Sequence, residues 1–299
     1  MSTFDYQNGR LHAESVCLSD LADQVGTPFY CYSASALEHR YRRLAEAISA
    51  SGTTIAYAVK ANSNLAVVSL LGGLGSGADV VSEGELRRAM AAGIPADRIL
   101  FSGVGKSVDE LAFAIGEGIH QINIESETEF DRVLDLAQRA VRTVRIALRI
   151  NPGIEAGGHD KISTGRKTDK FGISAGHALE LYRRAEKHAF VEPVGLAMHI
   201  GSQISDVSAF AGAFDYLAEA TDDMRRKGLT VSRLDLGGGL GVAYHDDEQE
   251  LPLEDYGALL KSLALRTDAQ LTIEPGRWLV AGAGVLVTRV NAIKQAGDR

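Results

Sequence analysis

Residues 121–137 read QINIESETEFDRVLDLA, and this stretch contains one complete unit of the predicted fold. Its apolar beginning, Gln121–Ser126, predicts a strand. Ser126 and Glu129 then have the three-residue spacing of a helix capping box. The apolar residues that follow share one helical face: Phe130, Val133, Leu134 and Ala137. The stretch therefore predicts a strand that leads directly into a helix.

The same unit recurs through most of the chain. Runs rich in valine, isoleucine and leucine, with little polar alternation, are typical of parallel strands covered on both faces. Eight such runs are predicted: Thr53–Lys60, Gly77–Val81, Arg98–Gly103, Gln121–Ser126, Arg145–Asn151, Val194–Ser202, Arg233–Gly239 and Gln270–Gly276. Ser82 with Glu85 and Ser107 with Glu110 repeat the capping-box spacing after the second and third runs.

A further helix is predicted ahead of the first strand. Ser35 and Glu38 begin it, and its apolar face has four members: Leu37, Tyr41, Leu44 and Ile48. With seven connections between strands, this gives eight helices for eight strands. The alternation predicts an α/β fold, the (β/α)8 or TIM barrel, which needs about 200–250 residues or more. A doubly wound open sheet is the alternative.

The two ends of the chain do not fit the barrel. Residues 1–32 contain no clear barrel strand, and residues 279–295 are expected to be extended. We therefore expect residues 1–32 to belong to a β-rich second domain, residues 33–278 to form the barrel, and residues 279–299 to begin a C-terminal β-domain.

Composition excludes several classes of protein. With 299 residues, 45% hydrophobic and 23% charged, the chain is globular rather than disordered or fibrous. Its net charge is −8 and its basic residues are scattered, which argues against nucleic acid or a membrane as partner. No apolar run approaches the ~20 residues of a membrane span, and the polar N-terminus lacks a signal peptide's apolar core. The two cysteines are too few for a disulfide framework, so a cytoplasmic protein is expected.

Two basic residues lie where predicted strands end, the position of reacting groups in a barrel. Lys60 ends the first strand in YAVKAN, among apolar residues that would desolvate its amine, lower its pKa and favour imine chemistry. His199 ends the sixth in MHIGSQ. The alternatives are an ordinary surface lysine and an ordinary buried histidine.

The segment DLGGGLG, residues 235–241, follows the seventh strand. Three consecutive glycines let backbone N–H groups approach an anion, and this part of a barrel commonly binds phosphate. A dinucleotide-binding fingerprint would lie in the first βα unit, far from this glycine run, so dinucleotide binding is disfavoured.

The eighth strand ends in IEPGR, residues 273–277. A carboxylate that emerges from an apolar strand needs a partner. Glu274 could pair with Arg277, or it could hold the protonated ring nitrogen of a pyridine cofactor and leave Arg277 to bind a substrate carboxylate. The four sites together specify one ligand, pyridoxal 5′-phosphate. It carries an aldehyde for Lys60, a phosphate for the glycines, a ring face for His199 and a ring nitrogen for Glu274. A protonated pyridine ring is a stronger electron sink than an unprotonated one.

The four motifs, in this order, resemble those of diaminopimelate decarboxylase, one of the alanine-racemase-like, barrel-type pyridoxal-phosphate enzymes. The resemblance runs from Phe4 onward, and ISTG (162–165) and DKFGI (169–173) favour this family over its relatives. It implies that meso-diaminopimelate, the amino-acid substrate, loses the carboxylate at its D-centre and gives L-lysine and carbon dioxide. It also implies a homodimer with shared active sites, and no metal-ligating residue.

The resemblance further implies roles for single residues. Lys60 would bind the cofactor aldehyde covalently, and His199 would stack on its ring; these two are the expected catalytic residues. Arg277 would also bind substrate. The expected cofactor-binding residues are Lys60, Asp79, Arg149, His199, Ser202, Gly238, Gly239, Glu274, Pro275, Gly276 and Arg277.

The chain departs from the family pattern at its C-terminus. Family members continue through a β-domain that carries a Cys-Glu pair, donated across the dimer, and a tyrosine near the cofactor. Cys17 and Cys31 lie far from the position of that cysteine. The chain is therefore expected to be a fragment with negligible activity of its own.

Other functions remain open from the sequence. A decarboxylase of ornithine, arginine or carboxynorspermidine would use the same barrel chemistry. A non-catalytic pyridoxal-phosphate-binding barrel would lack flanking β segments, and a racemase would need a tyrosine from a C-terminal domain. The basic segment 153–170 is either a lid over an anionic substrate or a solvated loop.

Overall fold

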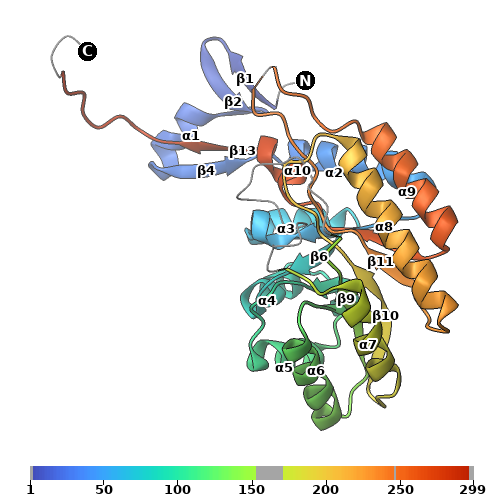
Figure 1. Ribbon diagram of the computed structural model, residues 1–299. Coiled ribbons are helices and arrows are strands. Elements are labelled where there is room, and N and C mark those ends of the chain that lie inside the picture. The colour runs from blue at the N-terminus through green and yellow to red at the C-terminus, as the bar shows by residue number, and fades with distance from the viewer. Residues whose placement is uncertain (1–2, 153–170, 246, 296–299) are drawn as a thin grey trace.

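Eight parallel strands close into a barrel in the computed structural model, which describes residues 3–152, 171–245 and 247–295 (Figure 1). The barrel strands are β5 (Thr54–Ala58), β6 (Gly77–Val80), β7 (Ile99–Phe101), β8 (Gln121–Ile124), β9 (Val144–Arg149), β10 (Val191–Ala197), β11 (Arg233–Asp235) and β12 (Gln270–Ile273). Pairing of β12 with β5, through Thr272 with Thr54 and Ile273 with Ile55, closes the ring. The predicted barrel is confirmed, and the open sheet is wrong.

Eight helices cover the barrel in the described part of the chain, as the alternation predicts. They are α2 (Ala34–Ile48), α3 (Leu65–Gly73), α4 (Glu83–Ala91), α5 (Val108–Glu117), α6 (Glu127–Ala140), α7 (Ala175–Glu186), α8 (Val207–Arg226) and α9 (Leu253–Thr267). Their apolar faces pack on strands that are themselves buried, so helices and barrel share one core. None of the described helices is both long and apolar enough to span a bilayer.

The predicted helix starts are partly corrected. Ser107 and Glu110 form a reciprocal capping box. Ser126 caps α6, but the Glu129 carboxylate accepts from the backbone N–H of Glu125 (2.9 Å), one residue before the box position. In α2 the capping serine is Ser33 rather than the predicted Ser35, because the Ser33 hydroxyl accepts from the N–H of Ala36 (3.1 Å).

The chain ends form a separate β-rich extension. It contains β1 (Phe4–Gln7), β2 (Arg10–Ala13), β3 (Val16–Cys17), α1 (Leu18–Val25) and β4 (Phe29–Tyr32), joined from the other end of the chain by β13 (Gly284–Val287). The short helix α10 (Arg277–Val280) precedes β13 and packs into the barrel core through Trp278 and Leu279. Strands β1, β2 and β3 form an antiparallel sheet, and β13 pairs antiparallel with β4. The extended stretch predicted from residue 279 is wrong at its start, where α10 and the 3-10 turn Ala281–Ala283 are helical.

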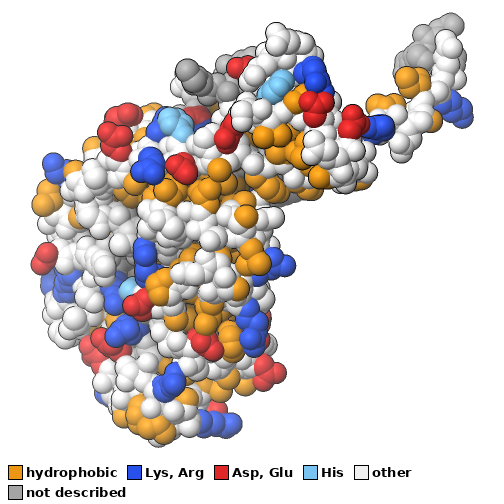
Figure 2. Space-filling view, turned by 180° about the vertical axis from the view of Figure 1, so that it is seen from behind, with side chains coloured by type: hydrophobic (Ala, Val, Ile, Leu, Met, Phe, Trp, Pro, Cys, Tyr) orange, Lys and Arg blue, Asp and Glu red, His pale blue; other side chains and the backbone are white. Residues whose placement is uncertain are grey.

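The extension projects from the barrel in Figure 1. Seen from behind in Figure 2, apolar side chains gather where the extension meets the barrel. Several large apolar side chains of the extension and of the segment that follows β13 are exposed: Tyr30, Leu286, Val290 and Ile293.

Candidate active site

The predicted motifs meet at the C-terminal ends of the barrel strands. Two adjoining pockets of about 250 and 530 Å³ lie there, and both are lined by Lys60, His199 and Glu274. The smaller pocket reaches Arg149, and the larger is lined by five more of the predicted residues: Ser202, Gly238, Gly239, Gly276 and Arg277. Barrel closure therefore brings residues from the first and last strands into one site.

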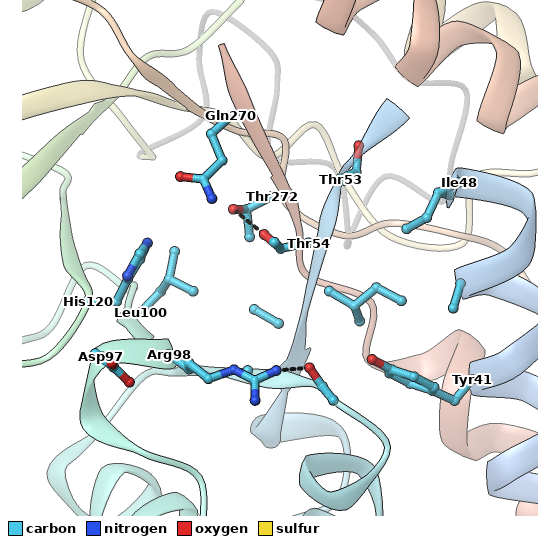
Figure 3. Close-up of a pocket in the computed structure, with 15 residues that line it drawn as sticks. Tyr41, Ile48, Thr53, Thr54, Asp97, Arg98, Leu100, His120, Gln270 and Thr272 are labelled. Carbon is cyan, nitrogen blue, oxygen red and sulfur yellow. Dashed lines mark hydrogen bonds between the residues drawn. The ribbon is translucent and has the colours of Figure 1, made fainter. Parts of the chain in front are cut away.

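A third hollow, of about 390 Å³, lies at the opposite end of the barrel (Figure 3). Thr54 and Thr272 face it with their hydroxyl oxygens 2.9 Å apart, and Arg98 crosses it to bond the carbonyl of Gly75. The described residues that line this hollow include no lysine. It thus lacks the amine that an aldehyde cofactor requires.

Lys60 follows β5 in a single 3-10 turn, Val59–Ala61, and its ammonium donates to Asp79 Oδ2 (3.0 Å). Asp79 lies on β6 and is fully buried. The nearby Asp79 carboxylate raises the pKa of Lys60, and this effect outweighs the opposing effect of burial. The sequence analysis predicted a lowered pKa, so that prediction is wrong: Asp79 keeps the amine protonated.

His199 is held as a neutral ring. Burial lowers its pKa well below the ordinary value, and the charges of Arg149 and Lys60 act in the same direction. The backbone N–H of Gly238 donates to His199 Nδ1 (3.1 Å), so the neutral ring carries its proton on Nε2. The ring plane is thereby fixed beside the pocket, as a residue that stacks on a cofactor requires.

The glycine turn after β11 has no room for side chains. A Cβ on Gly237 would lie 2.7 Å from His199 Nδ1, and one on Gly238 would lie 2.3 Å from the carbonyl oxygen of Glu274. Gly239 has a φ of +110° and would clash with the carbonyl of Gly201. Glycine is therefore needed here because the ends of β10, β11 and β12 approach one another closely. The expected phosphate contact of this turn stays a prediction.

Glu274 and Arg277 do not pair with each other. Glu274 Oε1 accepts from the Ser102 hydroxyl (3.2 Å), and its carboxyl shares a hydrogen bond with that of Asp235. Arg277 instead donates to the Tyr244 hydroxyl (2.7 Å). The simple ion-pair interpretation is thus wrong, and Glu274 is left to line both pockets.

Arg149 is oriented by its neighbours at the end of β9. It donates to Glu125 Oε1 (2.8 Å), and its guanidinium lies 5.2 Å from the centre of the Phe171 ring. The other Glu125 oxygen is buried without a hydrogen-bond partner among the described residues. These contacts hold the Arg149 side chain against the smaller pocket.

The remaining predicted residues complete the wall between β12 and β5. The carbonyl of Pro275 accepts from the N–H of Ala58 (3.2 Å), and Gly276 lines the larger pocket. A Cβ on Gly276 would lie 3.1 Å from the methyl groups of Ala58 and Ala61. Pro275 and Gly276 thus continue the contact between β12 and β5 up to the pocket beside Lys60.

These residues fit pyridoxal 5′-phosphate. Lys60 supplies an amine, His199 a neutral ring face, Glu274 a carboxyl for a ring nitrogen, and Ser202 a hydroxyl at the glycine turn. The second oxygen of Asp79, Oδ1, is buried without a hydrogen-bond partner in the described structure. It provides an acceptor beside Lys60 for a donor of a bound group.

Comparison with known proteins decides the family. The family model for the pyridoxal-binding domain of pyridoxal-dependent decarboxylases matches residues 34–281. A diaminopimelate decarboxylase from Zymomonas mobilis is 42% identical over 99% of this chain and 71% of its own length. The chain belongs to the diaminopimelate decarboxylase family. Its cofactor is accordingly pyridoxal 5′-phosphate.

Solved structures agree with this family. Diaminopimelate decarboxylase from M. jannaschii in complex with L-lysine has a TM-score of 0.92 at 34% identity, covering 99% of this chain and 71% of that one. The Helicobacter pylori enzyme with L-lysine has a TM-score of 0.87 at 40% identity, covering 90% and 68%.

Several residues of this decarboxylase site were missed by sequence reasoning. They are Ser102, Asn123, Glu125, Asp235 and Tyr244. Asp235 stands two residues before the first glycine of the turn, which could have drawn attention to it, whereas the others carry no motif. The predicted lid, 153–170, and the ISTG segment lie outside the described residues, as do the first two residues of DKFGI.

Proposed function

We propose that the site on this chain serves the pyridoxal-phosphate-dependent decarboxylation of meso-2,6-diaminopimelate to L-lysine and carbon dioxide, the last step of lysine biosynthesis. The observation that carries the proposal is that Lys60, His199 and Glu274 together line both pockets at the barrel mouth. The names of the relatives support diaminopimelate as substrate.

The cofactor, when bound, supplies an aldehyde carbon for an amine and a pyridine ring that accepts electron density from the substrate. Lys60 would bind its aldehyde carbon covalently, and Glu274 would hold a proton at its ring nitrogen. His199 would cover one face of the ring and exclude water from it. Ser202 and the backbone of Gly239 would bind the phosphate.

Arg277 is proposed to bind a substrate carboxylate. Its guanidinium lies at the edge of the larger pocket, where Tyr244 holds it from one side. A planar guanidinium can bind a carboxylate through two parallel hydrogen bonds. Asp79 and Arg149 are proposed to orient the amine and the cofactor at the opposite side.

A substrate panel tests this function. The panel is assayed on the chain extended by the C-terminal β-domain of the family, because the 299 residues alone are expected to decarboxylate negligibly. We expect meso-diaminopimelate to give equal amounts of lysine and carbon dioxide, with L-ornithine, L-arginine and carboxynorspermidine turned over far more slowly. Lys60→Ala, which lacks the amine, should be inactive with every substrate. Faster turnover of ornithine or arginine would assign the chain to another basic amino acid, and cofactor binding without any turnover would leave a non-catalytic barrel.

We also propose a cytoplasmic homodimer and a division of the chain at residues 32 and 278. The pairing of β4 with β13 supports a β-rich unit built from both ends. Exposed apolar side chains of this unit, such as Leu286, support a covering partner. Light scattering after size exclusion tests the dimer, which a monomeric mass at micromolar concentration would contradict.

A further inference from the structure

A closed ring of hydrogen bonds lies inside the barrel behind Glu274. Ser102 Oγ donates to Glu274 Oε1 (3.2 Å) and accepts from Asn123 Nδ2 (3.0 Å). The same Asn123 amide donates to Asp235 Oδ2 (2.6 Å), and the carboxyls of Asp235 and Glu274 share the hydrogen bond that closes the ring. All four side chains are buried, and they come from the ends of β7, β8, β11 and β12.

The ring holds two carboxyl groups that differ in their partners. Asp235 Oδ1 accepts from the backbone N–H of Gly237 (3.0 Å), while Oδ2 accepts from Asn123. Donors on both oxygens favour an ionised Asp235. Glu274 has one hydroxyl donor, from Ser102, so the proton between the two carboxyls is carried by Glu274. Burial, then Asp235, accordingly raise the pKa of Glu274.

The charged groups that face this pair from the surrounding elements are few. Among the described residues they include Asp79 on β6 and Lys60 after β5, which form an ion pair with each other, and Arg149 at the end of β9, which pairs with Glu125. Within each ion pair the two charges largely offset one another. Asp235 is the charge that remains directly behind Glu274.

We propose that Asp235, held by Asn123, is a positioning residue whose charge acts through Glu274 to retain the proton on the ring nitrogen of the bound cofactor. The inference rests on the proposed placement of that nitrogen at Glu274. When an unprotonated ring binds, the O–H bond of Glu274 breaks and an N–H bond forms, so one proton moves and no other reactant is needed. Two adjacent carboxylates then stabilise the positive ring.

The proton can be followed directly on the holoprotein. With cofactor labelled with 15N at the ring nitrogen, the NMR shift of that atom distinguishes the protonated from the unprotonated ring at each pH. In Asp235→Asn we expect the ring nitrogen to lose its proton about one pH unit or more below the pH at which the parent does, because a nearby negative charge that favours the protonated ring is removed. Asn123→Ala leaves Asp235 with one hydrogen-bond donor fewer, and it should lower the deprotonation pH of the ring nitrogen by a smaller amount.

Matched variants separate this inference from the proposed function. Glu129→Gln neutralises another buried carboxylate at the barrel mouth, one that pairs with Lys106 rather than with Glu274, and should leave the titration unchanged. A parental titration in Asp235→Asn and Asn123→Ala, or an equal shift in Glu129→Gln, would overturn the inference. A parental titration in Glu274→Gln would instead overturn the placement of the ring nitrogen.

Discussion

At the scale of single residues, the site depends on the protonation state of its side chains as well as on their positions. Asp79 keeps Lys60 protonated, while the buried His199 stays neutral. An ammonium is no nucleophile, so Lys60 must release its proton before it can bind an aldehyde. The ion pair with Asp79 therefore orients the amine and also slows its capture of the cofactor at neutral pH.

Neutralising Asp79 should make Lys60 a faster nucleophile near neutral pH. In Asp79→Asn the largest cause of the raised pKa is gone, and burial then lowers the pKa of Lys60. The rate of pyridoxal phosphate capture, followed by stopped-flow absorbance, should reach its plateau at least about one pH unit below that of the parent. Asp97→Asn, at the opposite end of the barrel, is the control. An unchanged profile in Asp79→Asn would show that Asp79 does not control the amine.

The residues that the sequence could not reveal are those joined only by barrel closure. Asn123 and Asp235 are 112 positions apart, and Ser102 and Glu274 are 172 apart. Serine, asparagine and aspartate are common at strand ends and carry no spacing signal. Lys60, His199 and Glu274 were predictable because each lies in a motif beside glycine or small residues, whereas the raised pKa of Lys60 depends on a contact with the next strand.

At the scale of elements, the order of strands and helices followed from their alternation, but their ends did not. The seventh strand was predicted to run to Gly239 and ends at Asp235. Beyond it the glycines leave the ladder, because their N–H groups bond to side chains: that of Gly237 to Asp235 and that of Gly238 to His199. Such tertiary contacts end a strand without changing the apolar character of the sequence around it.

The turn after β11 should not tolerate a methyl group at Gly238. A Cβ there would lie 2.3 Å from the backbone carbonyl of Glu274, which cannot move without shifting β12. We expect Gly238→Ala to lower the free energy of unfolding by about 1–3 kcal/mol and to weaken cofactor binding. Gly176→Ala, whose Cβ meets open space in α7, should leave both unchanged or slightly improved. Urea unfolding and absorbance titration measure the two effects, and equal behaviour of the variants would contradict the close approach.

At the scale of the whole molecule, the site joins strands that are distant in sequence. Lys60 follows β5, His199 follows β10 and Glu274 follows β12, so a ligand that contacts all three spans the closure of the ring. In the described part of the chain, no disulfide or metal site reinforces the pairing of β12 with β5 that closes the ring, since both cysteines are free and no metal-binding cluster occurs. Cofactor binding is therefore expected to stabilise the barrel as a unit.

Pyridoxal phosphate should accordingly raise the Tm of the chain. At a concentration one hundred times its Kd, a ligand that binds only the folded state adds about 2.7 kcal/mol, which corresponds to roughly 5 °C for a chain of this size. Lys60→Ala keeps the turn and Glu274 but loses the covalent bond, so its shift at the same concentration should be smaller. Hydrogen exchange should show slower exchange on β5, β10 and β12 together, because opening any of them releases the ligand. Protection confined to the glycine turn would mean that the cofactor stabilises one loop and leaves the closure of the barrel unaffected.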